Sequence, residues 1–403
     1  MKDYTSIRAI CKKNSSISST VIDEFLIYYV ASQNKVEPKM SQEFSRYKHV
    51  TKKFQAEWVA RLKAQYLAHL IFKENGYIKS ILNHSRLHNI NQVERKFLEQ
   101  QARQAWRFSF SFITGNPAKD FYLMQDVFSG DKYTLFSPGI TDIKEEQSTT
   151  LWFNLVGYNG ACWQSFGPIG AYKSFEPDDI YFFATELRPE IEDDKEILED
   201  VEKNPVPYMM LLSGANYPLS FNKKDQMVQA ISEYDLDSIN TQELKKSFKT
   251  EYCDNVYRLT LKDWGEPPHF AQAYFDEIEK IIILSASTDR GFEALVNGIN
   301  QYGYSFSKEP FIRVNISMII TAKDILKKEI ILNEYDNLFQ QETSKESQEE
   351  IDKLNAFMAL ILPDINAGRK PDIEGLAKKA GVDVNVARDI IQNVIGKLGK
   401  MGK

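Results

Sequence analysis

The chain has 403 residues, of which 43% are hydrophobic and 26% are charged, and its formal net charge is −6. These values are typical of globular proteins, and they exclude a fibrous, a collagen-like or a wholly disordered chain. At about 100–200 residues per domain, the length predicts two to four domains. No apolar run approaches the roughly 20 residues that span a bilayer, and the first residues lack the apolar core of a signal peptide. We therefore expect a soluble protein without a membrane partner.

The spacing of the cysteines and of the glycines excludes several common structural and cofactor-binding motifs. Cys11, Cys162 and Cys253 lie far apart and form no C-x-x-C pair, so neither a disulfide framework nor a structural zinc site is predicted. Such cysteine usage is typical of a reducing compartment, and we expect a cytoplasmic protein. No G-x-G-x-x-G loop and no Walker-type loop occurs, and we predict no cofactor.

Charge is distributed unevenly along the chain. Residues 1–110 hold 19 Lys and Arg against 9 Asp and Glu, residues 111–350 hold 22 against 41, and residues 351–403 hold 9 against 6. The net charges of the three segments are therefore +10, −19 and +3. Two interpretations remain open: the basic segment docks on the acidic middle of the same chain, or it binds an external anionic partner such as nucleic acid.

The N-terminal segment has helical periodicity. Apolar residues at helical spacing predict one long helix from about Ser41 to Asn75 and another over 92–105. We interpret the aromatic residues of the long helix as bundle core, because base-stacking platforms are usually exposed on sheets or in grooves. His84 and His88 share the i, i+4 spacing of a metal pair, but two further ligands are missing, so no metal site is predicted.

The spacing changes to that of strands at Trp106. Alternating residues predict a strand from Arg107, a hairpin of 121–127 and 132–136 around Ser129-Gly130, and further strands near 150–156, 162–166, 180–187 and 208–212. Four glycines fall within 157–170, where they permit close backbone approach to a ligand. A ligand cleft at 157–183 is one interpretation, and the core of a β domain is the other. The candidate cleft residues are Tyr158, Cys162, Trp163 and Gln164.

Residues 250–335 have the pattern of a small α/β unit. Strands are predicted at 256–261, 280–285 and 311–320, and Ser287-Thr288-Asp289 predicts the cap of a helix that ends near Asn300. The strand–helix–strand order fits a βαβ unit or part of an α+β sandwich. His269 is the only histidine outside the N-terminal helices, and nothing in the sequence places it near Cys162 for nucleophilic catalysis.

The C-terminal segment predicts two short helices joined at Gly381. Leu376-Ala377, Gly381-Val382, Ala387 and Ile390 follow a spacing that resembles the helix-turn-helix of bacterial repressors, over about 25 residues. The resemblance implies a trihelical unit and nucleic-acid contacts, although trihelical units also serve as docking modules. Base-reading side chains would be Asn385, Arg388 and Gln392, and phosphate-binding ones Lys378, Lys379 and Lys397.

These patterns predict a multidomain α+β protein. We expect a basic helical domain at 1–105, a mostly antiparallel β-rich domain at 106–249, an α/β unit at 250–339 and a C-terminal helical unit at 348–403. The leading hypothesis is an intracellular binding or regulatory protein that contacts nucleic acid or a protein partner through its basic ends. The alternatives are an enzyme or small-ligand-binding protein with the cleft at 157–183, and a structural or assembly component. No complete catalytic signature occurs, so no catalytic residue is predicted.

Overall fold

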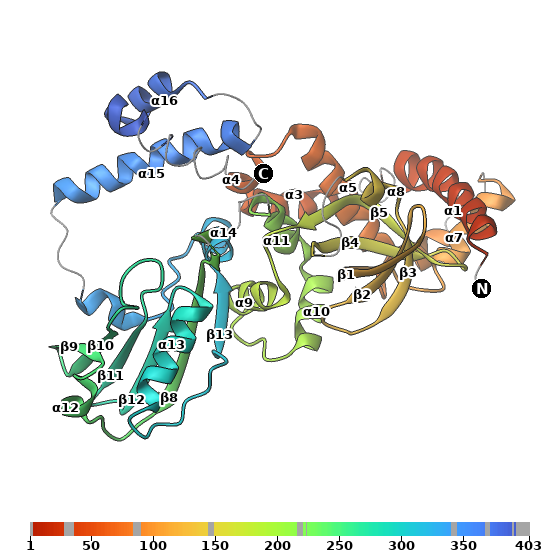
Figure 1. The fold of residues 1–403 in the computed structure, drawn as a ribbon. Coiled ribbons are helices and arrows are strands. Elements are labelled where there is room, and N and C mark those ends of the chain that lie inside the picture. The colour runs from red at the N-terminus through yellow and green to blue at the C-terminus, as the bar shows by residue number, and fades with distance from the viewer. Residues whose placement is uncertain are drawn as a thin grey trace. The chain divides into compact units, whose positions relative to one another are not determined.

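The computed structural model describes residues 3–27, 36–83, 90–143, 149–215, 221–222, 224–339, 345–366, 371–388 and 391. The chain divides into two compact units, Met1–Asn333 and Glu334–Lys403, which we call unit 1 and unit 2. Helices and two larger sheets build unit 1 (Figure 1), so the predicted α+β class is confirmed. Every described helix is too short or too polar to cross a lipid bilayer.

The described part of the N-terminal segment is helical. The single helix predicted from Ser41 to Asn75 is wrong, because the helical backbone is interrupted at Tyr47 and again between Thr51 and Ala56, where Gln55 has an extended backbone (φ −65°, ψ 143°). Apolar spacing continues across such a break, so periodicity does not detect it. The aromatic stripe is core, as predicted, with Phe44 and Tyr66 buried. The helices are α1 (Tyr4–Ser18), the π-helix η1 (Ser19–Leu26), α3 (Val36–Arg46), α4 (Lys48–Thr51), α5 (Ala56–Phe72), α6 (Ile78–Leu82) and α7 (Gln92–Gln101).

Five strands then close into a barrel in the order β1-β2-β3-β5-β4. All neighbouring strands are antiparallel except β3 and β5, which are parallel. This strand order, with a short helix between β3 and β4, is that of the five-stranded Greek-key barrel called the OB-fold. The predicted hairpin around Ser129-Gly130 is confirmed. The elements are β1 (Arg107–Ala118), β2 (Phe121–Asp126), β3 (Lys132–Phe136), α8 (Pro138–Asp142), β4 (Leu151–Tyr158) and β5 (Trp163–Tyr172).

The chain after the barrel is helical where two strands were predicted. The strand predicted at 180–187 is wrong, because a capping box of Glu176 and Asp179 and a proline at the first helical position start α9 (Pro177–Leu187). The strand predicted at 208–212 is wrong for a similar reason, since Pro205 starts α11 (Pro205–Met210). Between them the acidic run forms α10 (Asp194–Lys203), and η3 (Leu211–Ser213) follows α11.

The rest of unit 1 contains a two-stranded antiparallel sheet of β6 and β7 and a six-stranded antiparallel sheet in the order β13-β8-β12-β11-β10-β9. The helix α13, capped by Thr288 as predicted, covers one face of this sheet (Figure 1). Both β12 and β13 run antiparallel to β8, so they are parallel to each other and α13 makes the crossover. The predicted strand 311–320 ends at Asn315, where α14 begins. The elements are β6 (Phe221–Asn222), β7 (Asp225–Gln226), β8 (Val228–Asp235), α12 (Thr241–Leu244), β9 (Phe248–Cys253), β10 (Val256–Leu261), β11 (Gln272–Asp276), β12 (Ile281–Ala286), α13 (Asp289–Asn300), β13 (Ile312–Asn315) and α14 (Ile316–Leu326).

The largest apolar core joins the N-terminal helices to the outer face of the barrel and to α9, α11 and α14. Ion pairs cross the same boundary between the basic and the acidic segments. They are Arg8–Asp120 at 2.6 Å, Lys53–Asp324 at 2.6 Å and Arg107–Asp131 at 3.0 Å. Ion pairs within unit 1 therefore neutralise part of the opposite charges of the two segments.

Unit 2 contains η4 (Glu334–Phe339), α15 (Lys345–Asn366), α16 (Ile373–Ala380) and a helical segment at 384–388. Gly381 ends α16 with φ +72°, the left-handed conformation expected of it. Asp383 caps the following segment, because its side chain accepts the backbone N–H groups of Asn385 and Val386. α15, α16 and the chain after Gly381 share one apolar cluster around Phe357, Ile361, Ala377, Ala387 and Ile391.

Candidate ligand-binding cavity

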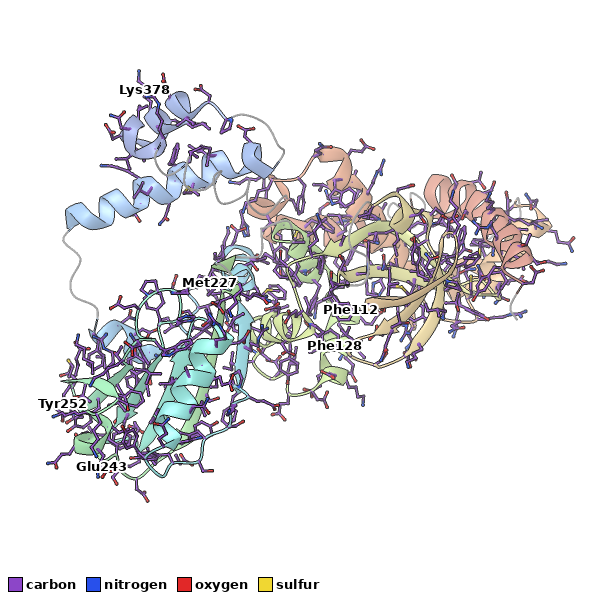
Figure 2. All side chains as sticks on the ribbon, viewed as in Figure 1. Phe112, Phe128, Met227, Glu243, Tyr252 and Lys378 are labelled. Atoms are coloured by element: carbon purple, nitrogen blue, oxygen red, sulfur yellow. The ribbon has the colours of Figure 1, made fainter. Side chains whose placement is uncertain are left out.

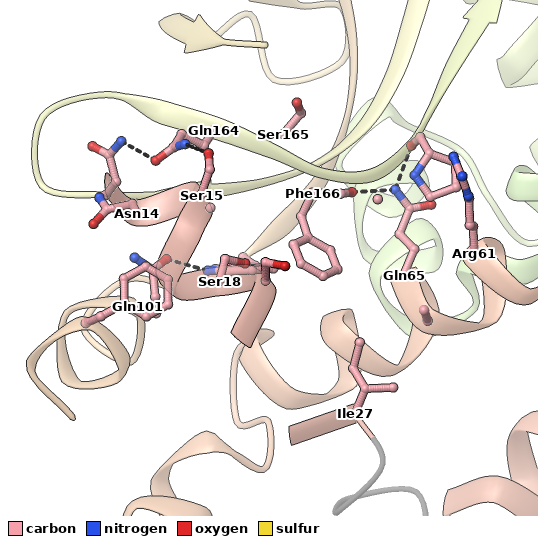
Figure 3. Close-up of a pocket in the computed structure, with 18 residues that line it drawn as sticks. Asn14, Ser15, Ser18, Ile27, Arg61, Gln65, Gln101, Gln164, Ser165 and Phe166 are labelled. Atoms are coloured by element: carbon pink, nitrogen blue, oxygen red, sulfur yellow. Dashed lines mark hydrogen bonds between the residues drawn. The ribbon is translucent and has the colours of Figure 1, made fainter. Parts of the chain in front are cut away.

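A cavity of about 520 Å³ lies in unit 1 between α1, α5, α7 and the first half of β5 (Figure 3). Its volume is within the range of small-molecule sites. Most of its polar lining is uncharged. The lining contains the carboxamides Asn14, Gln65, Gln101, Asn159 and Gln164, the hydroxyls of Ser15, Ser18, Ser19 and Ser165, the rings of Phe97, Trp106 and Phe166, and the guanidinium of Arg61.

Gln65 fixes the wall formed by β5. Its side chain is 3% exposed, and its Nε2 donates to the carbonyl oxygens of Phe166 and Pro168, each at 2.8 Å (Figure 3). Between Phe166 and Gly170 β5 leaves regular register with β4, and Gly167 there has φ +73°. A Cβ on Gly167 would lie 3.0 Å from the Cβ of Gln65, so glycine allows α5 and β5 to approach this closely.

Trp106 fixes the wall formed by α7. Its indole N–H donates to Gln101 Oε1 at 2.9 Å, and its ring stacks on Phe72 with centroids 4.3 Å apart. Gly157 on β4 lies against the same indole, where a Cβ would come within 2.4 Å of Nε1. Trp106 is 4% exposed and held from several directions, so we regard it as a rigid wall.

A network of amides attaches α1 to the β4–β5 loop. Asn159 Oδ1 accepts the backbone N–H groups of Ala161 and Cys162, both at 2.9 Å, and Asn159 Nδ2 donates to Gln164 Oε1 at 2.6 Å. Gln164 Nε2 donates in turn to the carbonyl oxygen of Cys11 at 3.1 Å and to Ser15 Oγ at 3.2 Å. The loop and the helix therefore form one wall whose amides are already oriented.

The cavity is electrostatically simple. Arg61 is the only charged side chain among its described lining residues. Its partner is Glu57, one helical turn earlier, at 2.6 Å, and the two side chains are 61% and 73% exposed. An ion pair this exposed contributes little, so the guanidinium remains able to bind an anion. The described lining supplies no carboxylate, imidazole or thiol that could serve as a general acid or base.

Only one of the four candidate cleft residues lines this cavity. Gln164 does, whereas Cys162 is buried beside Cys11. Tyr158 and Trp163 contact each other with ring centroids 5.6 Å apart, and Arg107 lies 5.4 Å from the Trp163 ring. The two aromatic residues belong to a neighbouring surface at the end of the barrel.

Sequence reasoning missed Gln65, Gln101 and Trp106. A signal for Gln65 exists in the sequence, because it is a polar residue within the buried stretch of α5. A buried amide needs a hydrogen-bond partner, and here the partner is a strand about 100 residues later. Local spacing cannot supply that partner.

The candidate nucleic-acid residues of unit 2 differ in their surroundings. Lys378 and Lys379 are exposed in the last turn of α16, and Lys378 lies on the side turned away from α15 (Figure 2). Asn385 is also exposed, whereas Arg388 forms an ion pair with Glu374. Gln392 and Lys397 lie outside the described residues, as do the candidate metal ligands His84 and His88.

The remaining histidines have structural partners. His269 Nδ1 lies 2.7 Å from Thr288 Oγ1, and that hydroxyl also accepts the N–H of Gly291 to cap α13. Burial lowers the pKa of His269. Thr288 is 1% exposed and His269 is half-buried, and the pair serves as a helix cap. His49 Nε2 lies 2.7 Å from the carbonyl oxygen of Asp324. Within the described parts of the chain, no three His, Cys, Asp or Glu side chains are grouped to hold a metal ion.

No protein-family model, no curated protein and no solved structure matches this chain. The function therefore has to be inferred from the geometry of the cavity and of unit 2.

Proposed function

We propose that unit 1 is a small-molecule-binding protein whose cavity takes a nucleobase-containing ligand, a nucleoside or a nucleotide. The observation that carries this proposal is the composition of the lining: five carboxamides and a half-buried phenyl ring line an open cavity of about 520 Å³, and the described lining has no carboxylate. The proposal develops the small-ligand alternative that the glycine-rich stretch suggested. It favours binding over catalysis, because the described lining holds no acid–base group.

Carboxamides suit the edge of a nucleobase. Each presents a donor and an acceptor side by side, and asparagine and glutamine pair with adenine through both groups at once. The donors for a base edge would come from Asn14 and from Nε2 of Gln101. Gln65, Asn159 and Gln164 already donate both of their amide hydrogens to protein acceptors, so they offer a base only carbonyl oxygens, which are held in place before any ligand arrives. Pre-orientation of this kind lowers the entropy cost of binding.

Phe166 and Arg61 suit the other parts of such a ligand. Phe166 is only half buried and projects between α1 and α5 (Figure 3), so one ring face can stack on a base. Stacking of this kind contributes about 1–3 kcal/mol per base. The exposed guanidinium of Arg61 has the geometry to bind a phosphate. The OB-fold strand order of the barrel is shared with oligonucleotide- and oligosaccharide-binding proteins, but strand order alone carries no function.

Calorimetric titration of the full chain with adenosine, uridine, AMP and glucose tests this proposal. We expect the nucleosides and AMP to bind and glucose not to bind. Phe166→Ala should weaken nucleoside binding by about 5- to 160-fold, which corresponds to the loss of one stacking interaction. Arg61→Ala should weaken the binding of AMP without affecting the binding of adenosine. Arg46 is an equally exposed arginine on α3, and Arg46→Ala should change the binding of neither ligand. An unchanged affinity of Phe166→Ala for nucleosides, or no nucleoside binding at millimolar concentrations, would refute the proposal.

A second candidate function is contact of unit 2 with DNA, which would follow from the resemblance to repressors. It is favoured by the exposure of Lys378, Lys379 and Asn385 on two helical segments joined at Gly381. Duplex binding across a salt series tests it, with Lys378→Ala/Lys379→Ala as the variant. We expect binding that falls steeply with salt, and a salt slope smaller by about one for each lysine that can no longer bind a phosphate. The absence of binding at low salt would leave protein docking as the role of unit 2.

A further inference from the structure

Two buried thiols lie in contact where α1 meets the β4–β5 loop. Cys11 Sγ and Cys162 Sγ are 3.4 Å apart, and the residues are 0% and 3% exposed although 151 positions separate them in the chain. Both belong to a small apolar cluster in which Tyr4 and Phe121 also pack. The third cysteine, Cys253, lies on β9 in another part of unit 1.

We propose that Cys11 and Cys162 form a reversible disulfide when a hydroperoxide reaches them, and that this bond regulates the cavity by fixing α1 to the barrel. The formation of the bond is independent of the ligand. Its regulatory consequence rests on the proposed function, because α1 contributes Asn14, Ser15 and Ser18 to the lining.

The surroundings activate Cys11 as the first nucleophile. The hydrogen bond with Cys162 lowers the pKa of Cys11, and so do the amide of Asn159 and the nearby charge of Arg8, while burial acts in the opposite direction. Asn159 Nδ2 donates to Cys11 Sγ at 3.2 Å and lies 3.8 Å from Cys162 Sγ. A thiolate at Cys11 is thereby stabilised, and the thiolate is the reactive form.

The reaction balances with hydroperoxide as the only oxidant. The Cys11 thiolate attacks one oxygen of H₂O₂, the O–O bond breaks, and the second oxygen leaves as water after taking up a proton, which gives a sulfenic acid on Cys11. Cys162 sulfur then attacks Cys11 sulfur, the S–O bond breaks, and the hydroxyl leaves as water with the proton of Cys162. Two thiols are oxidised to one disulfide, and one peroxide is reduced to two waters.

The amides of Asn159 and Gln164 separate the cavity from the thiols, so a peroxide reaches the sulfurs when these side chains move aside. Asn159 and Gln164 line the cavity, and each also makes a hydrogen bond to Cys11. A peroxide molecule in the cavity is therefore one amide layer from the sulfurs. Because Sγ of Cys162 is already in contact with Cys11, the sulfenic acid meets its resolving thiol without movement of the helix.

Thiol titration and intact mass of the full chain after treatment with H₂O₂ test this proposal. We expect the wild type to lose two of its three thiols and the mass of two hydrogens, and dithiothreitol to restore both. Cys253→Ser should behave in the same way with its two remaining thiols. Cys11→Ser and Cys162→Ser should instead keep their hydrogens or gain oxygen. Retention of all three wild-type thiols, or gain of oxygen without loss of two hydrogens, would overturn the proposal.

Amide hydrogen exchange tests the consequence for α1. We expect exchange in residues 4–18 to slow by about tenfold or more in the oxidised wild type, with no such change after the same treatment of Cys162→Ser. An unchanged exchange rate in a chain whose disulfide has formed would overturn the regulatory part. If the disulfide forms and α1 becomes protected but nucleosides do not bind, the oxidation site stands and the proposed function fails.

Discussion

Asn315, at the end of β13, donates its backbone N–H to Asp179 Oδ1 at 2.8 Å, and its side-chain amide donates to the second oxygen of the same carboxylate. Asp179 lies in the first turn of α9 and is 1% exposed. Burial raises its pKa to about 6, although the hydrogen bonds from Glu176 and Asn315 oppose that rise. One buried carboxylate thus connects the helices beside the barrel to the start of α14.

This carboxylate should make stability depend on pH. Its ordinary pKa is 3.8, so the folded state binds the proton more tightly than the unfolded state. The stabilising contribution of the protonated group is fully present below about pH 4 and is lost as the pH rises through about 6. The free energy of unfolding should therefore fall by about 2 kcal/mol between pH 4.5 and pH 8 because of this group alone.

Urea unfolding of the wild type and Asp179→Asn across that pH range measures the effect. The variant cannot ionise at this position, so the stability difference between the two proteins should change by about 2 kcal/mol over the range. The exposed neighbour Asp178 provides the control. The free energy of unfolding of Asp178→Asn, plotted against pH, should run parallel to that of the wild type. Parallel curves for Asp179→Asn would show that Asp179 titrates normally.

Glu202 makes a second connection, between three elements. Its Oε2 lies 2.7 Å from Nε2 of the fully buried His69 on α5, and its Oε1 accepts the backbone N–H of Phe108 on β1 at 2.7 Å. Glu202→Ala would leave both buried donors without partners, so we expect a loss of about 2–4 kcal/mol in unfolding free energy. Glu199→Ala, which removes only an exposed pair with Lys203 on the same helix, should cost less than about 0.5 kcal/mol in urea unfolding. Similar losses in the two variants would contradict this role of Glu202.

The elements that sequence predicts well are those with local signals. The strand Val256–Leu261 and the helix that Thr288 caps lie where alternation and capping residues place them. The strand predicted at 180–187 failed because Tyr181, Phe182 and Phe183 favour strands locally, while the capping box and the core select a helix.

The sequence predicted only part of the candidate site. The glycine-rich stretch pointed to the correct region, and Gln164 lines the cavity. The other walls come from α1, α5 and α7, which carry no motif. The roles of Gln65 and Gln101 depend on their hydrogen bonds with Phe166 and Trp106 in the folded chain. The pair of Gln65 and Phe166 joins residues 101 positions apart, a tertiary contact that local spacing does not encode.

Gly157 tests the rigidity of the cavity wall. A methyl group at this position would lie 2.4 Å from Trp106 Nε1 and 2.5 Å from Cε2, and the indole is held by Gln101 and Phe72. We therefore expect Gly157→Ala to destabilise unit 1 by about 1–3 kcal/mol. Gly115→Ala on β1 is the control, because its methyl group would meet only the exposed side chain of Leu123 at 3.3 Å. Equal urea midpoints for the two variants would show that the indole can move.

Gly381 tests the turn of unit 2 separately from its packing. The backbone there has φ +72°, while a Cβ would meet nothing closer than the Lys353 side chain at 3.8 Å. A substitution is therefore penalised by backbone strain and not by a clash, and Gly381→Val should cost about 1–3 kcal/mol. Gly381→Asn should cost less, because asparagine tolerates the left-handed region. Amide exchange of residues 373–380 in the full chain measures the cost of each substitution. We expect faster exchange in Gly381→Val than in Gly381→Asn. Equal exchange in the two variants would mean that the turn does not determine the stability of α16.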